Sequence, residues 1–580
     1  MSGWSVSALA VMAALGVPLA LTLVVMLPPT RKAGVMLAPW AALPTLGLAL
    51  GGGTQLNWPH VLLGMRLYSP DEVTRTYLLF TGVLWLFSGL FARGYLREDG
   101  RKASFWGFYL ATLVGNVGAV LARDMASFYL FFAMMTFCAY GLVVHSRDER
   151  AARAGRVYII MALVGEVLLL AAFFLIAGTR INLTFDEVPR VVAESPERTL
   201  ICALILAGFG VKVGVLLLHM WLPLAHPVAP APGSAVLSGT IIKVGVLGWL
   251  RFLPLGEARV PEVGQVCVAA GLAASFYGVL VGLTQKDAKT VLAYSSISQM
   301  GFLTLAVGLA LGAPEAAPAL VGAVLVYATH HSLAKGLLFL GAGLVHETGR
   351  RGWRAVVVWV GLVWAGLEIA GAPLTSGALA KLSLKSAEAV AHAPEVVPTL
   401  LSLAAVGSTL IMARFLARVL PDAPEQGARD TGGMWLSWVL LLVVDTVLLV
   451  RPPVGAELLP RLLEPKNLGS AAWPVAVGVA LSAVAWRMRR SRSVPEIPAG
   501  DVLWPLSRLV LPGWRLLTRG AEREDSKPSE LSVFTLRWFA RLRDVFLRMV
   551  DQGEAGLSRL SHVGFLLLVF LGVFLFLLVR

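Results

Sequence analysis

The sequence predicts an all-α polytopic membrane protein with about sixteen transmembrane helices, and three observations support this fold class. Of the 580 residues, 57% are hydrophobic and only 14% are charged, which is about half the charged share of a soluble domain. The mean hydropathy is +0.74. The apolar residues form long blocks separated by short charged stretches, as in a chain that crosses a bilayer many times as helices. The composition therefore excludes a soluble enzyme.

The expected spans follow from the length of the apolar blocks, at about 20 residues for each crossing. The first block is too long for the apolar part of a signal peptide, and further spans follow it, so we expect it to be the first anchor. The predicted spans lie near residues 6–26, 34–52, 76–93, 104–122, 125–144, 157–177, 199–219, 233–252, 263–283, 289–311, 318–345, 353–376, 397–419, 434–450, 469–487 and 562–580.

The basic residues predict the orientation of the chain in a cell inner (plasma) membrane. Most of them sit in short loops and in one C-terminal segment. Clusters follow the first, third, fifth, ninth and eleventh predicted spans, so these loops should face the cytoplasm and both termini the opposite side. Examples are Arg31, Arg97, Arg147, Lys286 and Arg354. The net charge of +14 is thereby explained by orientation and contact with anionic lipid, and no nucleic-acid partner is expected.

The C-terminal segment breaks the pattern of spans. Apolar residues recur there at steps of three and four, including Leu531, Phe534, Trp538 and Leu542. This spacing predicts an amphipathic helix over 529–560 that lies along the membrane or against partner helices, before the last span.

Ionisable residues inside the spans are the candidate functional groups, because each costs several kcal/mol in a bilayer. Desolvation allows a buried lysine to gain and lose a proton, so we expect a proton relay and no catalytic residue. No metal-ligand spacing, phosphate loop or domain for a cofactor appears, and the cysteines (Cys138, Cys202 and Cys267) sit in apolar spans. The candidate relay residues are Glu166, Lys212, His219, Lys243, His330, His331, Lys335, Glu368, Lys381 and Asp445.

Two spans are interrupted by prolines or glycines, which indicates broken helices of the kind that line ion sites. Lys212 and Lys243 flank the stretch 219–227, and Lys381 follows the stretch 366–373. The breaks lie five spans apart, which predicts a duplicated unit, and an odd number of spans requires the second copy to be inverted. The expected divisions are 1–103 (three spans), 104–254 and 255–420 (the repeats), 421–490 (two spans) and 491–580 (lateral helix and last span).

At these residues the chain resembles the antiporter-like subunits of respiratory complex I, which also occur in group 4 membrane hydrogenases, formate hydrogenlyases and multi-subunit Na⁺/H⁺ antiporters. The resemblance covers roughly residues 100–420 and is carried by the stretches 212–245, 286–301 and 331–343. It implies two inverted five-helix repeats with broken seventh and twelfth helices. It also implies that Lys212, Lys243, Lys335 and Lys381 are the lysines of the seventh, eighth, eleventh and twelfth helices.

The chain departs from this family at four places. Ala133 stands where the fifth helix usually carries a Glu, Leu217 where the seventh has a Pro, and Tyr327 where the eleventh often has a second His. The usual Gly-Phe-x-x-Lys becomes Gly377-Ala378-Leu379-Ala380-Lys381. We predict that Glu166 replaces the missing fifth-helix acid as the partner of Lys212.

The leading functional expectation is a proton-translocating subunit of a complex I-like (NADH/quinone) or hydrogenase-like membrane complex. Redox chemistry would occur in other membrane-complex subunits. Three alternatives remain open: a subunit of a multi-subunit Na⁺/H⁺ antiporter, the energy-coupling membrane subunit of an inorganic-carbon uptake complex with a zinc protein, and a scaffold that has lost transport. The transported ion is the proton or possibly Na⁺.

Overall fold

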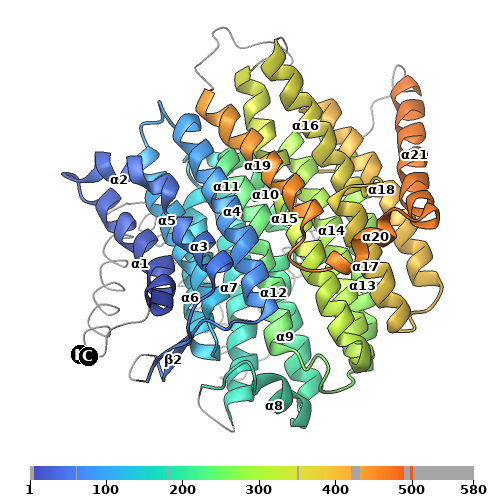
Figure 1. The fold of residues 1–580 in the computed structure, drawn as a ribbon, viewed down its shortest axis with the longest axis horizontal. Coiled ribbons are helices and arrows are strands. Elements are labelled where there is room, and N and C mark those ends of the chain that lie inside the picture. The colour runs from blue at the N-terminus through green and yellow to red at the C-terminus, as the bar shows by residue number, and fades with distance from the viewer. Residues whose placement is uncertain are drawn as a thin grey trace, which may run out of the picture.

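The predicted all-α membrane fold is confirmed by a computed structural model, which describes residues 6–59, 62–178, 182–348, 352–419, 432–488 and 497–500. Long helices form a bundle, and one short β-hairpin joins it near the N-terminus (Figure 1). Within the described ranges, 14 helical segments are long and apolar enough to cross a membrane. The predicted lateral helix over 529–560 and the last span over 562–580 lie outside the described residues.

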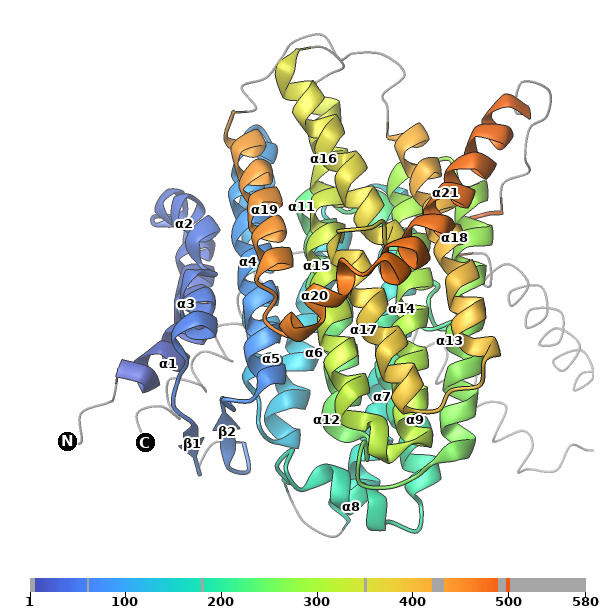
Figure 2. The same cartoon turned by 45° about the vertical axis from the view of Figure 1, so that its right-hand side comes forward.

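The first half of the bundle contains eight helices and the hairpin. The helices are α1 (Val6–Met26), α2 (Arg31–Leu37), α3 (Leu43–Gly51), α4 (Glu72–Tyr95), α5 (Lys102–Leu121), α6 (Met125–Val143), α7 (Glu149–Ala177) and α8 (Val188–Glu194). Strand β1 (Leu56–Trp58) pairs antiparallel with β2 (Met65–Leu67). The hairpin and α8 lie at the same end of the bundle, the lower one in Figure 2.

The second half contains the interrupted helices and the long central helices. They are α9 (Arg198–Val213), α10 (Trp221–Val228), α11 (Ala231–Val236), α12 (Ile242–Phe252), α13 (Pro261–Thr284), α14 (Ala288–Gly312), α15 (Ala317–Thr348), α16 (Trp353–Ala370), α17 (Ser376–Val390), α18 (Val396–Arg418), α19 (Gly432–Val450), α20 (Leu459–Leu462) and α21 (Pro465–Met488). A π-helical turn, Leu237–Ile241, joins α11 to α12. The predicted span over 199–219 corresponds to α9, which is shorter because the chain breaks after Val213.

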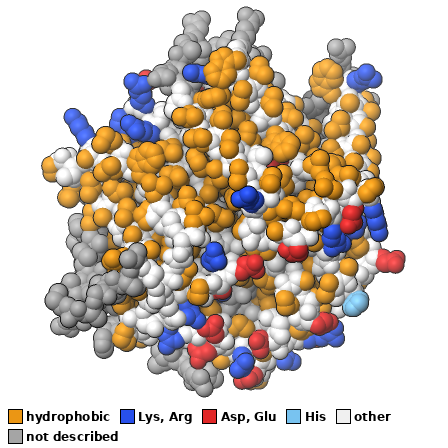
Figure 3. All heavy atoms as spheres, viewed as in Figure 1, with side chains coloured by type: hydrophobic (Ala, Val, Ile, Leu, Met, Phe, Trp, Pro, Cys, Tyr) orange, Lys and Arg blue, Asp and Glu red, His pale blue; other side chains and the backbone are white. Residues whose placement is uncertain are grey.

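Helix α15 lies in the centre of the bundle, and its stretch from Val324 to Val345 is buried throughout. Hydrophobic side chains cover a broad band of the face shown in Figure 3, while many of the charged ones lie in its lower half. This arrangement fits a chain whose outer surface contacts lipid. Buried ionisable side chains, by contrast, lie inside the bundle on α7, α9, α10, α12 and α15–α19.

Polar contacts at helix ends tie separate helices together. The Arg251 guanidinium at the end of α12 donates to both carboxylate oxygens of Asp71, each at 2.9 Å, just before α4. Partial burial opposes ionisation of Asp71, but the Arg251 charge and the Thr74 amide hold its pKa below the usual range. At the other end, Arg414 Nη2 donates to the Gln285 carbonyl oxygen after α13, at 2.6 Å.

Gly377, at the start of α17, sets how closely the two halves of the second broken helix approach. A methyl group on Gly377 would overlap the carbonyl oxygen of Glu368 on α16. We therefore expect Gly377→Ala to cost about 1–3 kcal/mol, the usual cost of overpacking a core, and to lower the melting temperature of the purified complex. Gly322→Ala on α15 is the matched control, because its methyl group would meet nothing within 4 Å. Equal melting temperatures for the two variants would contradict this packing.

Candidate functional site

The first broken helix ends where a glycine reverses the backbone. Gly214 follows α9 in the left-handed conformation (φ +82°), and Leu217 adopts φ +75° before α10 begins. A glycine takes this conformation without strain, whereas a leucine does not. The break thus lies at 214–220 and overlaps the predicted stretch 219–227 only at its first two residues, because the rest of that stretch belongs to α10. The indole Nε1 of Trp221 donates to the buried Val211 carbonyl oxygen at 2.7 Å and caps the end of α9.

Lys212 lies in the last turn of α9, just before this break, in a cage of aromatic rings. Its ammonium Nζ is 5.2 Å from the ring centre of Tyr158, 5.6 Å from that of Phe132 and 5.9 Å from that of Trp221. Nζ also donates to the Tyr158 hydroxyl at 3.3 Å. The faces of aromatic rings attract cations, so the cage can hold the charged form of Lys212 away from water. Ala133, where the family usually has a Glu, directly follows Phe132.

Glu166 is buried on α7, the helix that packs against α9. The two backbones approach closely there, since a methyl group on Gly165 would lie 3.0 Å from the Gly208 carbonyl oxygen. The charges of Glu166 and Lys212 act on each other, but the two groups form no ion pair within 4 Å. Neither carboxylate oxygen accepts a hydrogen bond from the described residues. The replacement of the missing acid by Glu166 therefore stays a prediction.

The second broken helix repeats the backbone of the first. Gly371 (φ +79°) follows α16, and Leu374 (φ +61°) precedes α17, with the same spacing as Gly214 and Leu217. The ammonium of Lys381, on α17, donates to the carbonyl oxygen of Ala370, the last residue of α16. Lys381 thus caps the end of α16, while Glu368 lies inside the last turn of that helix.

Lys243 and His331 form a direct contact at the centre of the bundle. The Lys243 ammonium lies 2.5 Å from Nδ1 of His331 and 2.6 Å from the Ser238 carbonyl oxygen, to which it donates. Ser238 belongs to the π-helical turn, which changes the backbone hydrogen-bonding pattern at this point. Both side chains are fully buried. Two cations would repel at this distance, so the contact requires one of the two groups to be neutral.

Lys335 lies one turn beyond His331 on α15, as their spacing of four predicted, and is fully buried. Its ammonium donates to the Leu292 carbonyl oxygen and to the Ser295 hydroxyl on α14, each at 2.8 Å. The Ser238 and Ser296 hydroxyls, 2.9 Å apart, link the π-helical turn to the same helix. Lys243, His331 and Lys335 therefore form one polar cluster among α12, α14 and α15.

A third cluster surrounds the second break. Nδ1 of His330 lies 2.7 Å from the Ser376 hydroxyl, which donates to Oε1 of Glu368 at 3.1 Å. The Asp445 carboxyl group, on α19, lies within hydrogen-bonding reach of Glu368. A cavity of about 20 Å³ is lined by His330, Ser376 and Asp445, large enough for about one water molecule.

Two buried histidines lie between these clusters. His219, in the first break, has its ring centre 5.4 Å from that of Tyr277 on α13 and is fully buried. His226, on α10, was not among the predicted relay residues. It is fully buried, stacks on Phe339 at 4.6 Å, and lies close enough to Lys335 and Lys243 for their charges to act on it. Its place in the same Pro-rich stretch as His219 was the signal in the sequence.

Other polar groups were also missed. Tyr158 and the serine hydroxyls cannot be told from ordinary core residues by sequence. Tyr327, which replaces a family histidine, donates to Oε1 of Gln299 at 2.6 Å and joins α15 to α14. Among the described residues, no group of three or more His, Cys, Asp or Glu side chains could hold a metal ion.

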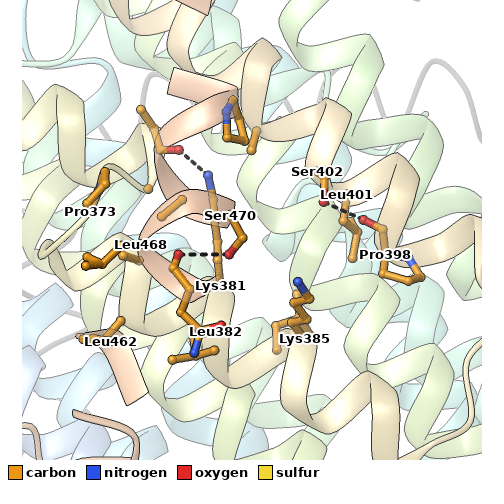
Figure 4. A pocket seen from close by; sticks show the side chains of 18 of the residues that line it. Pro373, Lys381, Leu382, Lys385, Pro398, Leu401, Ser402, Leu462, Leu468 and Ser470 are labelled. Carbon is orange, nitrogen blue, oxygen red and sulfur yellow. Dashed lines mark hydrogen bonds between the residues drawn. The ribbon is translucent and has the colours of Figure 1, made fainter. Parts of the chain in front are cut away.

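A pocket of about 80 Å³ opens beside the second break, between α17, α18 and α21 (Figure 4). Three residues at steps of four and three on α17 line it: Lys381, Lys385 and Glu388. Figure 4 shows Lys381 and Lys385 on the same side of α17. The pocket offers water a route toward the Lys381 ammonium.

Comparison with known proteins identifies the class to which this arrangement belongs. Residues 122–384 match the family described as NADH:quinone oxidoreductase/Mrp antiporter, TM. Hydrogenase-4 component B of Escherichia coli (strain K12) is 31% identical over 286 residues, 47% of this chain and 42% of that protein. NADH-quinone oxidoreductase subunit N of Desulforudis audaxviator (strain MP104C) is 29% identical over 305 residues, 52% of this chain and 58% of that protein. The chain thus spans about half the length of these curated relatives.

The solved structures agree with this class. A chain of the Mrp complex from Dietzia sp. DQ12-45-1b superposes with a TM-score of 0.72 at 23% identity, covering 94% of this chain and 63% of that one. The two chains therefore share a fold. The match over residues 122–384 confirms the resemblance to antiporter-like membrane subunits that the lysine and histidine motifs predicted.

The indole hydrogen bond at the first break can be tested by stability. Trp221→Phe leaves the buried Val211 carbonyl oxygen without its donor, so we expect a loss of about 1–3 kcal/mol beyond the packing cost. Trp249→Phe is the matched control. Trp249 is equally buried, but its Nε1 has no hydrogen-bond partner among the described residues. Thermal unfolding of the two purified variants measures the difference, and an equal loss would show that the cap does not stabilise the break.

Proposed function

We propose that this chain is a proton-translocating subunit of a multi-subunit redox complex in the plasma membrane. The observation that carries the proposal is the contact at 2.5 Å between Lys243 and His331, with Lys335 one turn away. A fully buried lysine and histidine at hydrogen-bonding distance can exchange a proton, and one must be neutral for the contact to exist. Packing of the helices does not require such a pair, because ionisable side chains are costly to bury in the centre of a membrane bundle.

The proposed path runs through the three clusters in order. A proton enters near Lys212 in the first break and passes by His219 to the cluster of Lys243, His331 and Lys335. From there it reaches His330 and the second break. Water molecules and the serine hydroxyls would bridge the gaps between clusters, since hydroxyl groups both donate and accept hydrogen bonds.

Coupling along the path would be electrostatic. A proton on one lysine raises the free energy of a second charge nearby, because the bundle interior screens charges less than water does. A conformational change in a partner subunit that moves a charge close to one lysine would therefore drive the proton from that lysine to the next titratable group on the path. Electron transfer would belong to those partner subunits, because the relatives of this chain are named as components of a hydrogenase and of an NADH-quinone oxidoreductase.

A subunit of a cation/proton antiporter is the second candidate, supported by the likeness to the Mrp complex. The lysines and histidines favour the proton as the transported ion in either case. A charged lysine has no lone pair with which to bind Na⁺, whereas Na⁺ requires oxygen ligands such as carboxylates. The role in inorganic-carbon uptake remains a third candidate. The fourth alternative, a scaffold that has lost transport, is disfavoured, because its buried lysines would lower the stability of the fold without serving a function.

Lys335→Ala tests the proposed function. We expect proton translocation by the reconstituted complex to fall about tenfold or more, which corresponds to about 1.4 kcal/mol or more, because a titratable group is lost from the centre of the path. Lys335→Arg should not rescue it, since a guanidinium scarcely deprotonates. Lys466→Ala, at an exposed lysine, is the control for lost charge. A pH-sensitive dye inside proteoliposomes measures transport. Normal transport by both Lys335 variants would refute the proposal.

A further inference from the structure

Asp445 is a buried acid outside both proposed repeats. It lies on α19, which follows the second broken helix and packs against α15, and only 1% of its surface is exposed. Glu368, from α16, is fully buried opposite it. Two helices that are distant in sequence thus bring two carboxyl groups together inside the membrane. Neither the family match, which ends at residue 384, nor the repeats account for Asp445.

The hydrogen bonds around this pair leave one oxygen of each carboxyl group open. Ser376 donates to Oε1 of Glu368. Oε2 of Glu368 and Oδ2 of Asp445 are buried and have no hydrogen-bond partner among the described residues. An unpaired buried carboxylate oxygen is costly, so these two atoms mark a place where a proton or a water molecule belongs.

The charges that face the pair cannot neutralise both acids. The nearby titratable groups are His330, from α15, and Lys381, from α17. The Lys381 ammonium is bound to the Ala370 carbonyl oxygen, and no ion pair joins either basic group to Glu368 or Asp445 within the described residues. Two ionised carboxylates at this range repel strongly in a poorly screened interior, so one of them must hold a proton.

A water-sized cavity leads away from the pair. Besides Asp445, Ser376 and His330, the cavity is lined by Pro452, Pro453 and Val454, in the turn that ends α19. This turn follows a helix that begins after a predicted cytoplasmic loop, so it lies toward the opposite side of the membrane. The cavity of about 20 Å³ therefore gives room for about one water molecule between Asp445 and this turn.

We propose that Asp445 and Glu368 form a carboxyl pair that holds one proton between them and releases it through the cavity toward the turn at Pro452–Val454. The inference rests on the proposed function and names the outlet of its path. Nδ1–H of His330 donates to the Ser376 hydroxyl, which donates to Oε1 of Glu368. A proton from the path first binds Nε2 of His330. The serine then passes its proton to Glu368 and takes the Nδ1 proton of His330 in return, which leaves His330 neutral, and the shared proton leaves Asp445 for the cavity water. No charge or proton is lost in this exchange.

Lys381 has a different role in this arrangement. Its ammonium caps α16 at the break and holds Glu368 and Ser376 in register, so Lys381 is a positioning residue. The residue that delivers the proton to water is Asp445.

Transport measurements test the outlet. We expect Asp445→Asn and Glu368→Gln each to lower proton translocation by the reconstituted complex about tenfold, and the double variant to be no slower than either single variant, because the residues act as one unit. Thr446→Val is the control. Thr446 is the exposed neighbour of Asp445, and its hydroxyl bonds only to its own helix, at the Leu442 carbonyl oxygen. Normal transport by Asp445→Asn overturns the inference. A double variant whose loss of transport equals the combined losses of the two single variants also overturns it.

Infrared spectroscopy tests the shared proton without any transport. The wild-type complex should show the carbonyl stretching band of a protonated carboxylic acid at neutral pH, shifted in D₂O. The band should be lost or displaced in Asp445→Asn and in Glu368→Gln, and unchanged in Thr446→Val. An unaltered band in either acid variant overturns the shared proton. If Lys335→Ala transports normally while the band behaves as expected, the proposed path fails but the carboxyl pair stands.

Discussion

A lysine ammonium inside a membrane bundle needs hydrogen-bond acceptors, because it has lost its hydration shell. A regular α-helix offers few, since its carbonyl oxygens already accept from the amides four residues onward. In this protein Lys243 reaches the carbonyl oxygen of a π-helical turn, and Lys381 reaches that of a helix end. Lys335 donates to a carbonyl oxygen within α14 and to a serine hydroxyl of the same helix. The irregular backbone thus supplies acceptors for Lys243 and Lys381, whereas Lys212 and Lys335 also depend on side-chain hydroxyl groups.

The rest of the architecture follows from this constraint. The breaks require left-handed glycines at 214 and 371, and the two halves of each broken helix must be held by further contacts. Trp221 supplies one such contact in the first break and Lys381 in the second. The same breaks leave space for His219, Ser376 and a water-sized cavity. A path for protons and a stable backbone are therefore obtained from the same irregularities.

The sequence predicted the helical membrane fold, both interruptions and the buried lysines, because charges and prolines inside apolar blocks are conspicuous. It could not place the first break at Gly214, since the left-handed Leu217 has no sequence signature. The approach of Asp445 to Glu368 depends on the packing of α19 against α15, and the Lys243–His331 contact joins residues 88 positions apart. His226 was overlooked because its importance comes from the lysines around it. These contacts are tertiary, and local patterns do not encode them.

The central claim is that buried lysines and histidines carry protons and need no other cation. The most direct measurement follows the internal pH of proteoliposomes that contain the intact complex, driven by its own partner subunits, in buffers with and without Na⁺. The account predicts the same rate of pH change in both buffers, because ammonium and imidazolium groups offer Na⁺ no ligand and the proposed carboxyl pair of Glu368 and Asp445 is occupied by a shared proton. A pH change that appears only when Na⁺ is present would contradict it.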